Sequence, residues 1–159
     1  MLLEFEHIIQ VNDLSNNAIA VLTRNQLWQG LVLRARNPDK FNHALQCKHE
    51  KLEENEFIRT VQAGGTSFCE RVTLCPEQKI CTKTVPDFDQ INAQSITSIE
   101  EPQTGSLFVR FHYKRDLDVI DEGVDVGEHL KAAYVRLDRD AIAIIRMLAD
   151  VELFDKTIN

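Results

Sequence analysis

The sequence predicts an α+β fold in which a curved, seven-stranded antiparallel sheet wraps around a long C-terminal helix, with two short helices between the first two strands. Residues 45–115 alternate between apolar and polar side chains in short runs separated by turn residues, which is the pattern of antiparallel strands. Residues 126–152 place apolar side chains along one helical stripe, which suits a helix that covers one face of a sheet. A sheet that bends around a single helix tends to leave a cavity between them.

Length and composition predict one globular domain that spans residues 1–159. Hydrophobic residues make up 43% of the chain and charged residues 27%, which is ordinary for a domain with a packed core. The net charge of −7 argues against nucleic-acid binding and against attachment to an anionic membrane. No run approaches the roughly 18 apolar residues of a spanning helix, and the start MLLEFEHII is acidic rather than basic. We therefore expect no membrane insertion and a cytoplasmic location.

Motifs for metals, nucleotides and nucleophilic catalysis are missing from the sequence. The four cysteines form no C-x-x-C pair and no zinc-finger spacing with histidine, so we interpret them as free thiols. The acidic run DLDVID at 116–121 does not meet the EF-hand spacing. There is no P-loop, dinucleotide fingerprint or G-x-S-x-G elbow. We expect no metal and no cofactor.

The N-terminal third predicts a strand followed by the two short helices. The segment LLEFEHIIQVN at 2–12 alternates as a half-buried strand, with His7 on its apolar face. Thr23 and Gln26 form a capping box that begins a helix, and Asn37-Pro38 ends it. The segment DKFNHAL at 39–45 predicts a second, short helix or a turn.

Six more strands are expected, and their apolar faces define one side of the sheet. They lie near 45–51, 56–63, 66–74, 79–85, 94–101 and 106–115, with turn residues at Gly64-Gly65, Pro76-Glu77 and PQTG 102–105. The run LFVRFHY places Leu107, Val109, Phe111 and Tyr113 on one face. The terminal helix follows, with a stripe formed by Val126, Leu130, Ala133/Tyr134, Leu137, Ala141, Ile144/Ile145 and Leu148. The charged residues Arg136, Asp138, Arg139, Asp140 and Arg146 are assigned largely to the other faces.

The chain resembles the AtaL-like family of the START-like superfamily, whose members share the helix-grip fold. The resemblance rests on LTRNQLWQGLVLRARNPDKF at 22–41, ERVTL at 70–74, SIEEPQTGSLFVRFHY at 98–113 and AAYVRLDRDAIAIIRMLAD at 132–150. It implies an apolar pocket between the sheet and the long helix and no universal catalytic residue. One departure is VELFD at 151–155, where the family pattern leads us to expect a glycine after the last helix.

Two charged residues interrupt the apolar face of the hairpin around Gly64-Gly65. A two-residue loop puts Ala63 opposite Thr66, so that Arg59 lies opposite Glu70 on one face of the sheet. One interpretation is a structural ion pair that fixes the strand register. The other is that Arg59, Glu70 or both direct polar groups at a ligand in the pocket.

The candidate site consists of the residues that these patterns direct toward the pocket. They are His7, Phe57, Arg59, Val61, Phe68, Glu70, Val72, Phe111, Tyr113, Tyr134 and Leu137. A histidine or tyrosine on an apolar face is also often a core residue whose polar atom has found a partner. The leading hypothesis is a protein that binds a small hydrophobic or aromatic molecule. The alternatives are a polyketide cyclase/dehydratase-like enzyme, with His7, Glu70 or a tyrosine moving protons, and a protein-interaction module with a filled core; no catalytic residue is assigned, and oligomeric state stays open.

Overall fold

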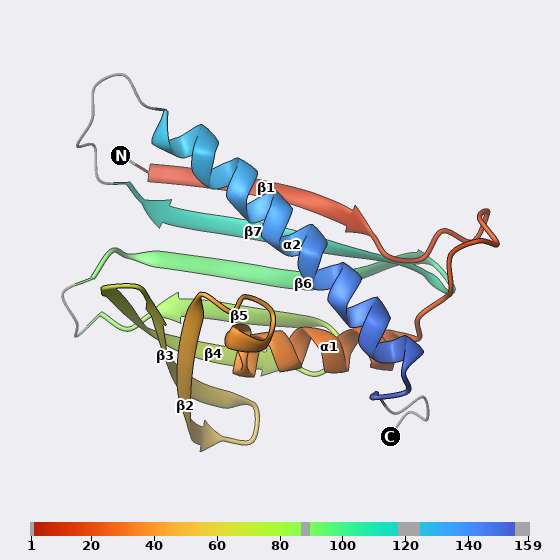
Figure 1. The fold of residues 1–159 in the computed structure, drawn as a ribbon, viewed down its shortest axis with the longest axis horizontal. Helices are drawn as coiled ribbons and strands as arrows, with labels where there is room; N and C mark the ends of the chain where they lie inside the picture. Colours follow the sequence, from red (N-terminus) through yellow and green to blue (C-terminus); the bar gives the residue numbers. More distant parts are fainter. Residues whose placement is uncertain (1, 87–89, 118–124, 155–159) are drawn as a thin grey trace.

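The computed structural model describes residues 2–86, 90–117 and 125–154, and its architecture is an antiparallel sheet packed against a long C-terminal helix (Figure 1). The elements in chain order are β1 (Leu2–Gln10), α1 (Arg24–Arg36), the 3-10 helix η1 (Pro38–Lys40), β2 (Leu45–Glu53), β3 (Glu56–Ala63), β4 (Thr66–Cys75), β5 (Lys79–Thr84), β6 (Ala93–Gln103), β7 (Ser106–Asp116) and α2 (Val126–Asp150). This confirms the predicted α+β helix-grip fold. The acidic run at 116–121 falls largely outside the described residues.

The seven strands form one sheet in the order β1-β7-β6-β5-β4-β3-β2, and every neighbouring pair is antiparallel. Strands β2 to β7 follow one another along the sheet in chain order, as successive antiparallel hairpins do. The first strand instead pairs with the last, so that β1 and β2 lie at opposite edges.

The β3–β4 hairpin has the register that its glycines predict. Ala63 pairs with Thr66, and counting outward Arg59 pairs with Glu70. Gly64 adopts a φ of 61°, a left-handed conformation that glycine reaches without steric cost. The predicted register is therefore confirmed. The face that carries Phe57, Val61 and Val72 is the buried one, as their apolar side chains predict.

Helix α1 begins and ends where its capping signals indicate. The Thr23 hydroxyl accepts a hydrogen bond from the Gln26 backbone N–H at 3.0 Å, and the Gln26 side chain accepts one from the Thr23 backbone N–H at 2.9 Å. The predicted second short helix is the single turn η1, which starts at Pro38. Among the described residues, no helix is long and apolar enough to cross a membrane.

Helix α2 runs obliquely across the sheet and buries one stripe of side chains (Figure 1). The stripe consists of Asp138, Ala141, Ile142, Ile145 and Ala149. Assigning Asp138 to an outer face was wrong, because its side chain is only 1% exposed. The helix ends at Asp150, two residues before the predicted end, and Glu152 adopts the left-handed φ of 58° that a glycine would favour.

The two long helices touch at a glycine. A Cβ atom built on Gly30 of α1 would lie 2.5 Å from the Ile145 side chain of α2, which is far closer than side chains pack. Helices that approach this closely hold each other in a defined position. The contact therefore sets where the middle of α1 lies relative to the last third of α2.

Candidate ligand-binding cavity

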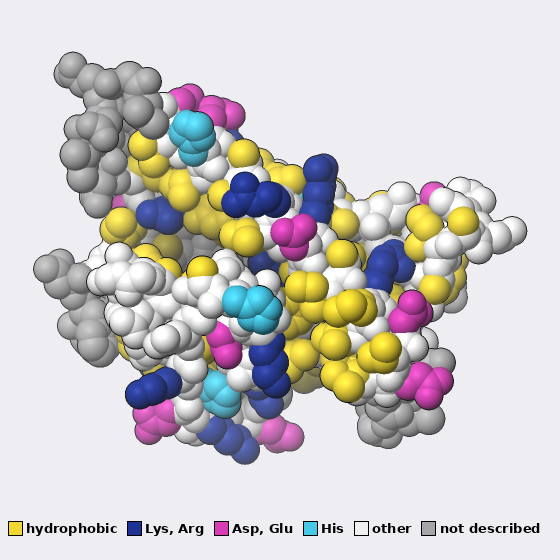
Figure 2. Space-filling view, in the orientation of Figure 1, with side chains coloured by type: hydrophobic (Ala, Val, Ile, Leu, Met, Phe, Trp, Pro, Cys, Tyr) yellow, Lys and Arg dark blue, Asp and Glu magenta, His cyan; other side chains and the backbone are white. Residues whose placement is uncertain are grey.

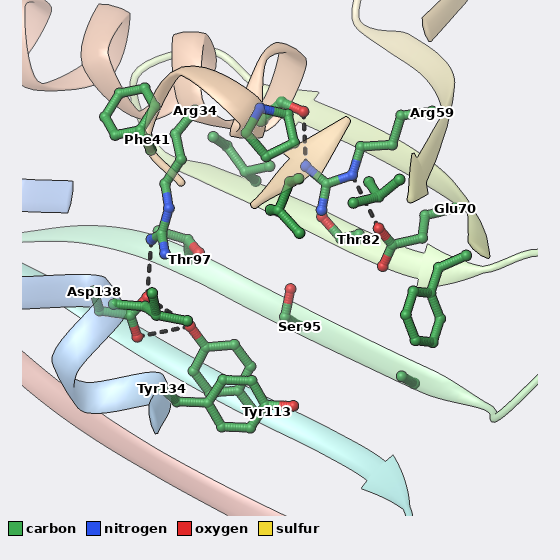
Figure 3. Close-up of a pocket in the computed structure, with 18 of the residues that line it drawn as sticks. Arg34, Phe41, Arg59, Glu70, Thr82, Ser95, Thr97, Tyr113, Tyr134 and Asp138 are labelled. Carbon is green, nitrogen blue, oxygen red and sulfur yellow. Dashed lines mark hydrogen bonds and ion pairs between the residues drawn. The ribbon is translucent and has the colours of Figure 1, made fainter. Parts of the chain in front are cut away.

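A cavity of about 320 Å³ lies between the sheet, α1 and α2. Strands β3 to β7 form its floor, α2 covers one side, and the end of α1 with the segment leading into β2 covers the other. In the space-filling view the surface is hollowed between the first half of α2 and this segment (Figure 2). Figure 3 shows the side chains that converge on the space from all of these elements.

Seven of the eleven candidate residues lie on the cavity wall. They are Arg59, Val61, Phe68, Glu70, Tyr113, Tyr134 and Leu137. The other four lie elsewhere: Phe57, Val72 and Phe111 are buried in the hydrophobic core, and the half-buried His7 lies behind the wall. His7 stacks on Phe111, with ring centroids 5.1 Å apart. Residues on the same face of the sheet therefore do not all line the cavity, because the hydrophobic core covers much of that face.

Arg59 and Glu70 form an ion pair that lines the cavity (Figure 3). Arg59 Nε donates to Glu70 Oε1 at 3.0 Å, and Arg59 Nη1 donates to the Ala35 carbonyl oxygen at 2.7 Å. The side chains are 16% and 17% exposed, so the pair is partly withdrawn from water. The pair links β3, β4 and the last turn of α1, and it also presents charged groups to the cavity.

A second polar cluster is centred on the Asp138 carboxylate, at the opposite side of the cavity (Figure 3). Arg34 Nη1 donates to Oδ1 at 2.8 Å, and His7 Nε2 lies 2.7 Å from Oδ2. The Tyr113 hydroxyl donates to the same carboxylate, 2.6 Å from Oδ2 and 2.8 Å from Oδ1. We call these four residues the Asp138 cluster. It joins α1, α2, β1 and β7 through one buried charge.

Within the Asp138 cluster, Tyr113 is the residue that also stacks on an aromatic ring of the cavity wall. Burial and the neighbouring Asp138 carboxylate raise the pKa of its hydroxyl well above the ordinary value, so the group stays a proton donor. Its ring stacks on that of Tyr134, with centroids 4.0 Å apart and planes 6° from parallel. The two rings give this end of the cavity a flat aromatic wall.

The floor of the cavity carries hydroxyl groups that the sequence analysis missed. Thr82 and Thr84 on β5 and Ser95 and Thr97 on β6 line the space. Thr84 is engaged within the protein, because its hydroxyl accepts a hydrogen bond from the Ala93 backbone N–H at 3.1 Å. The alternation of side chains along β5 and β6 shows that the hydroxyl residues of each strand share one face. It does not show whether that face points toward the cavity, which depends on the pairing of β5 with β4 and β6.

Arg34 and Asp138 were also missed, although helical spacing contains a signal for both. Asp138 follows Tyr134 by four positions and precedes Ala141 by three, which places it within the apolar stripe of α2. Arg34 follows Leu31 by three positions on the inner side of α1.

Among the described residues, no group of three or more His, Cys, Asp or Glu side chains could hold a metal ion.

A family model described as AtaL, acetylaranotin biosynthesis cluster protein L, matches residues 9–151. Among curated proteins, none matches the chain significantly. Solved structures with the same fold include the di-domain ARO/CYC StfQ from the steffimycin biosynthetic pathway, with 11% identity and a TM-score of 0.69 over 96% of this chain. The chain spans only 52% of that protein.

Two further structures match over nearly their whole length. The Zhui aromatase/cyclase from Streptomyces sp. R1128 has a TM-score of 0.67 at 9% identity, with 96% of each chain covered. The protein Ara h 8.0201 has a TM-score of 0.59 at 11% identity, with 91% of this chain and 98% of the other covered. At such low identity these matches establish the shared fold alone.

Proposed function

The chain belongs to the AtaL family, and from this premise we propose that it binds an apolar or aromatic small molecule in the cavity between the sheet and α2. The observation that carries the proposal is the cavity itself. Its volume of about 320 Å³ lies near the lower end of the range of ligand pockets, roughly 300–1,000 Å³. A concave space of this size between a sheet and its covering helices, open to the surface on one side, is the usual form of a small-molecule site.

The composition of the walls supports the same proposal. Apolar and aromatic side chains such as Leu31, Phe41, Phe68 and Leu137 form much of the surface. The polar groups come from the Arg59–Glu70 pair, the Asp138 cluster, the hydroxyls of the floor, and Asn42 and Arg115. This combination is typical of sites where apolar area supplies affinity and a few polar contacts fix orientation.

The printed descriptions of the matching proteins agree with a role in small-molecule metabolism. The family is described by a biosynthesis cluster, and two of the structures are described as aromatase/cyclases. An interaction module with a filled core is less well supported, because a cavity separates part of the sheet from α1 and α2. Cytoplasmic location and the lack of a nucleic-acid partner, metal and cofactor stay predictions.

Two measurements test binding. Native mass spectrometry of the protein purified from its own host should reveal a co-purified small molecule. In solution, an environment-sensitive aromatic dye should bind to the protein, and Leu137→Trp should weaken its binding about tenfold or more by filling the cavity. Met147→Trp is the matched control, because Met147 lies on the same helix and is 58% exposed. Equal dye affinity in the two variants would overturn the cavity as the binding site.

A second candidate function is a cyclase or dehydratase that uses the same cavity. It is favoured by Glu70 and Tyr113, two proton-transfer groups on the wall, and by the Asp138 carboxylate between Tyr113 and His7. An aldol cyclisation would form one carbon–carbon bond and dehydration would then release one water. Mass spectrometry of a poly-β-carbonyl probe after incubation would detect that loss. A bell-shaped pH profile that disappears in Glu70→Gln or His7→Ala would support catalysis, whereas a pure binder would lose only affinity.

A further inference from the structure

Three hydroxyl groups at the centre of the cavity floor have no hydrogen-bond partner within the described part of the chain. They belong to Thr82, Ser95 and Thr97, which we call the hydroxyl patch (Figure 3). The charged side chains nearest to the patch are engaged: Arg34 and Asp138 bond to each other, and Arg59 bonds to Glu70. The patch therefore presents hydrogen-bonding capacity to a ligand that the described part of the chain does not use.

The register of the sheet places these three side chains next to one another. Thr82 on β5 pairs directly with Ser95 on β6, so their Cβ atoms are about 4.5–5.5 Å apart. Thr97 lies two residues further along β6, on the same face. Since β5 and β6 lie between β4 and β7, the hydroxyl patch lies between Glu70 on one side and Tyr113 on the other.

A ligand in the cavity must cover the hydroxyl patch, and its chemistry decides the energetic result. A hydrocarbon surface would displace water from the three hydroxyls and supply no partner, which is unfavourable for each group. An oxygen atom of the ligand can accept or donate at each position, because a Ser or Thr hydroxyl does both. The centre of the site therefore favours a ligand with oxygen atoms in the middle of its surface rather than at one end only.

The charged groups point to the same chemistry. Arg59 faces Glu70 and Arg34 faces Asp138, so neither guanidinium is an unpaired charge beside the hydroxyl patch. Arg115 of β7 also lines the cavity, where it donates to the Asp116 carbonyl oxygen and adds N–H donors for a ligand oxygen. A guanidinium has five N–H donors, and the hydrogen bonds of Arg59 to other described residues use only its Nε and Nη1. The donors that are left suit neutral acceptors such as carbonyl and phenol oxygens.

The shape of the wall adds a preference for rings. Aromatic side chains surround the space, namely Phe41, Phe68, Tyr113 and Tyr134. Flat aromatic surfaces pack best against other flat rings, by offset stacking or edge contacts. We propose that the ligand is a ring compound with several oxygen substituents, such as phenol or ring-carbonyl groups, and that the hydroxyl patch selects it over a hydrocarbon or an acyl chain. This inference rests on the proposed function and specifies its ligand class.

The test compares three probes of one shape that differ only in oxygen count: naphthalene, 2-naphthol and 2,7-dihydroxynaphthalene. Affinities measured by fluorescence titration should rise along the series, with the dihydroxy compound binding about tenfold or more tightly than naphthalene. In Thr82→Val/Ser95→Ala/Thr97→Val this preference should fall to about threefold or less, while naphthalene binds at least as well as before. Thr60→Val/Ser67→Ala is the matched control, because both residues are exposed on the other face of the sheet.

The outcomes separate the two proposals. If naphthalene binds and is blocked by Leu137→Trp but hydroxyl groups bring no gain, the ligand class is wrong and the binding function stands. If none of the probes binds, both proposals fail. Thr→Val keeps the branched shape of the side chain, so the triple variant should fold, which circular dichroism checks. If it does not fold, the single variants decide, and each should reduce the preference about two- to fivefold.

Discussion

The cavity has two arginine–carboxylate pairs, and they differ in how the chain brings their partners together. Arg59 and Glu70 are 11 residues apart on two strands of one hairpin. Arg34 and Asp138 are 104 residues apart, on two different helices, and His7 reaches the same carboxylate across 131 residues. The first pair has both side chains about one-sixth exposed, whereas Asp138 is 1% exposed.

The comparison shows that a local pair and a long-range pair stabilise different things. A turn alone sets the geometry of Arg59 and Glu70, so this pair reinforces a register that the glycines already favour. The Asp138 cluster can form only when α1, α2, β1 and β7 are all in place. We therefore expect the long-range cluster to report on tertiary packing, and four predictions test that difference.

Asp138→Asn should be the most destabilising of the four changes, lowering the free energy of unfolding by about 3 kcal/mol. The change removes the negative charge that faces Arg34 and places an N–H group where only acceptor oxygens now lie. Arg34 is one-quarter exposed, which keeps the loss near the lower end of the range for a broken buried pair. Urea unfolding measures it, with the exposed Asp140→Asn as control. A loss smaller than that of Glu70→Gln would contradict the ranking.

Gly30→Ala should cost about 2 kcal/mol, because the added methyl group overlaps the Ile145 side chain. Gly30 lies one turn before Arg34, so pushing the helices apart should also weaken the contact between Arg34 and Asp138. A double-mutant cycle with Asp138→Asn should therefore show coupling, while a cycle with Glu70→Gln should be closer to additive. If the free-energy changes are additive in both cycles, the contact between Gly30 and Ile145 does not influence the Asp138 cluster.

Glu70→Gln should cost about 1.5 kcal/mol, less than the change at Asp138. The pair is partly exposed, and Arg59 keeps its hydrogen bond to the Ala35 carbonyl oxygen when Glu70 loses its charge. Thermal unfolding should give the difference. Glu56→Gln is the matched control, because it alters an exposed cross-strand pair with Arg71 and should change stability by less than about 0.5 kcal/mol.

Tyr113→Phe should have the smallest effect near neutral pH, about 1 kcal/mol for one lost hydrogen bond. It should also change how stability depends on alkaline pH. Burial beside Asp138 raises the pKa of Tyr113 in the folded chain above its ordinary value of 10.0. Above pH 10 the unfolded chain therefore binds fewer protons than the folded chain, and stability falls by up to about 1.4 kcal/mol per pH unit.

The measurement is urea unfolding at a series of pH values between 9 and 11. The unmodified chain should lose stability as pH rises through this window, and Tyr113→Phe should lose less, so that the two curves converge. Tyr134→Phe is a suitable control, since it changes a tyrosine that stacks on Tyr113 and sits on the same wall. Parallel curves for the unmodified chain and Tyr113→Phe would refute the altered proton binding.

The elements of the fold and one of the two ion pairs could be predicted from the sequence because their causes are local. Alternation, the Gly64-Gly65 turn and the capping box act over a few residues, so the strands, the start of α1 and the facing of Arg59 toward Glu70 follow from short stretches of chain. The same reasoning located α2 to within two residues at its end. All of these features can be predicted without knowing which elements pack against each other.

The composition of the cavity wall was decided by the tertiary structure. Whether Asp138 points into solvent or into the protein depends on the rotation of α2 about its axis, which Ile145 and Gly30 set across the helix contact. The hydroxyl patch becomes a patch only when β5 pairs with β6. Both depend on contacts between residues far apart along the chain. Spacing can place Asp138 within the apolar stripe of α2, but it does not show which distant side chains that stripe meets.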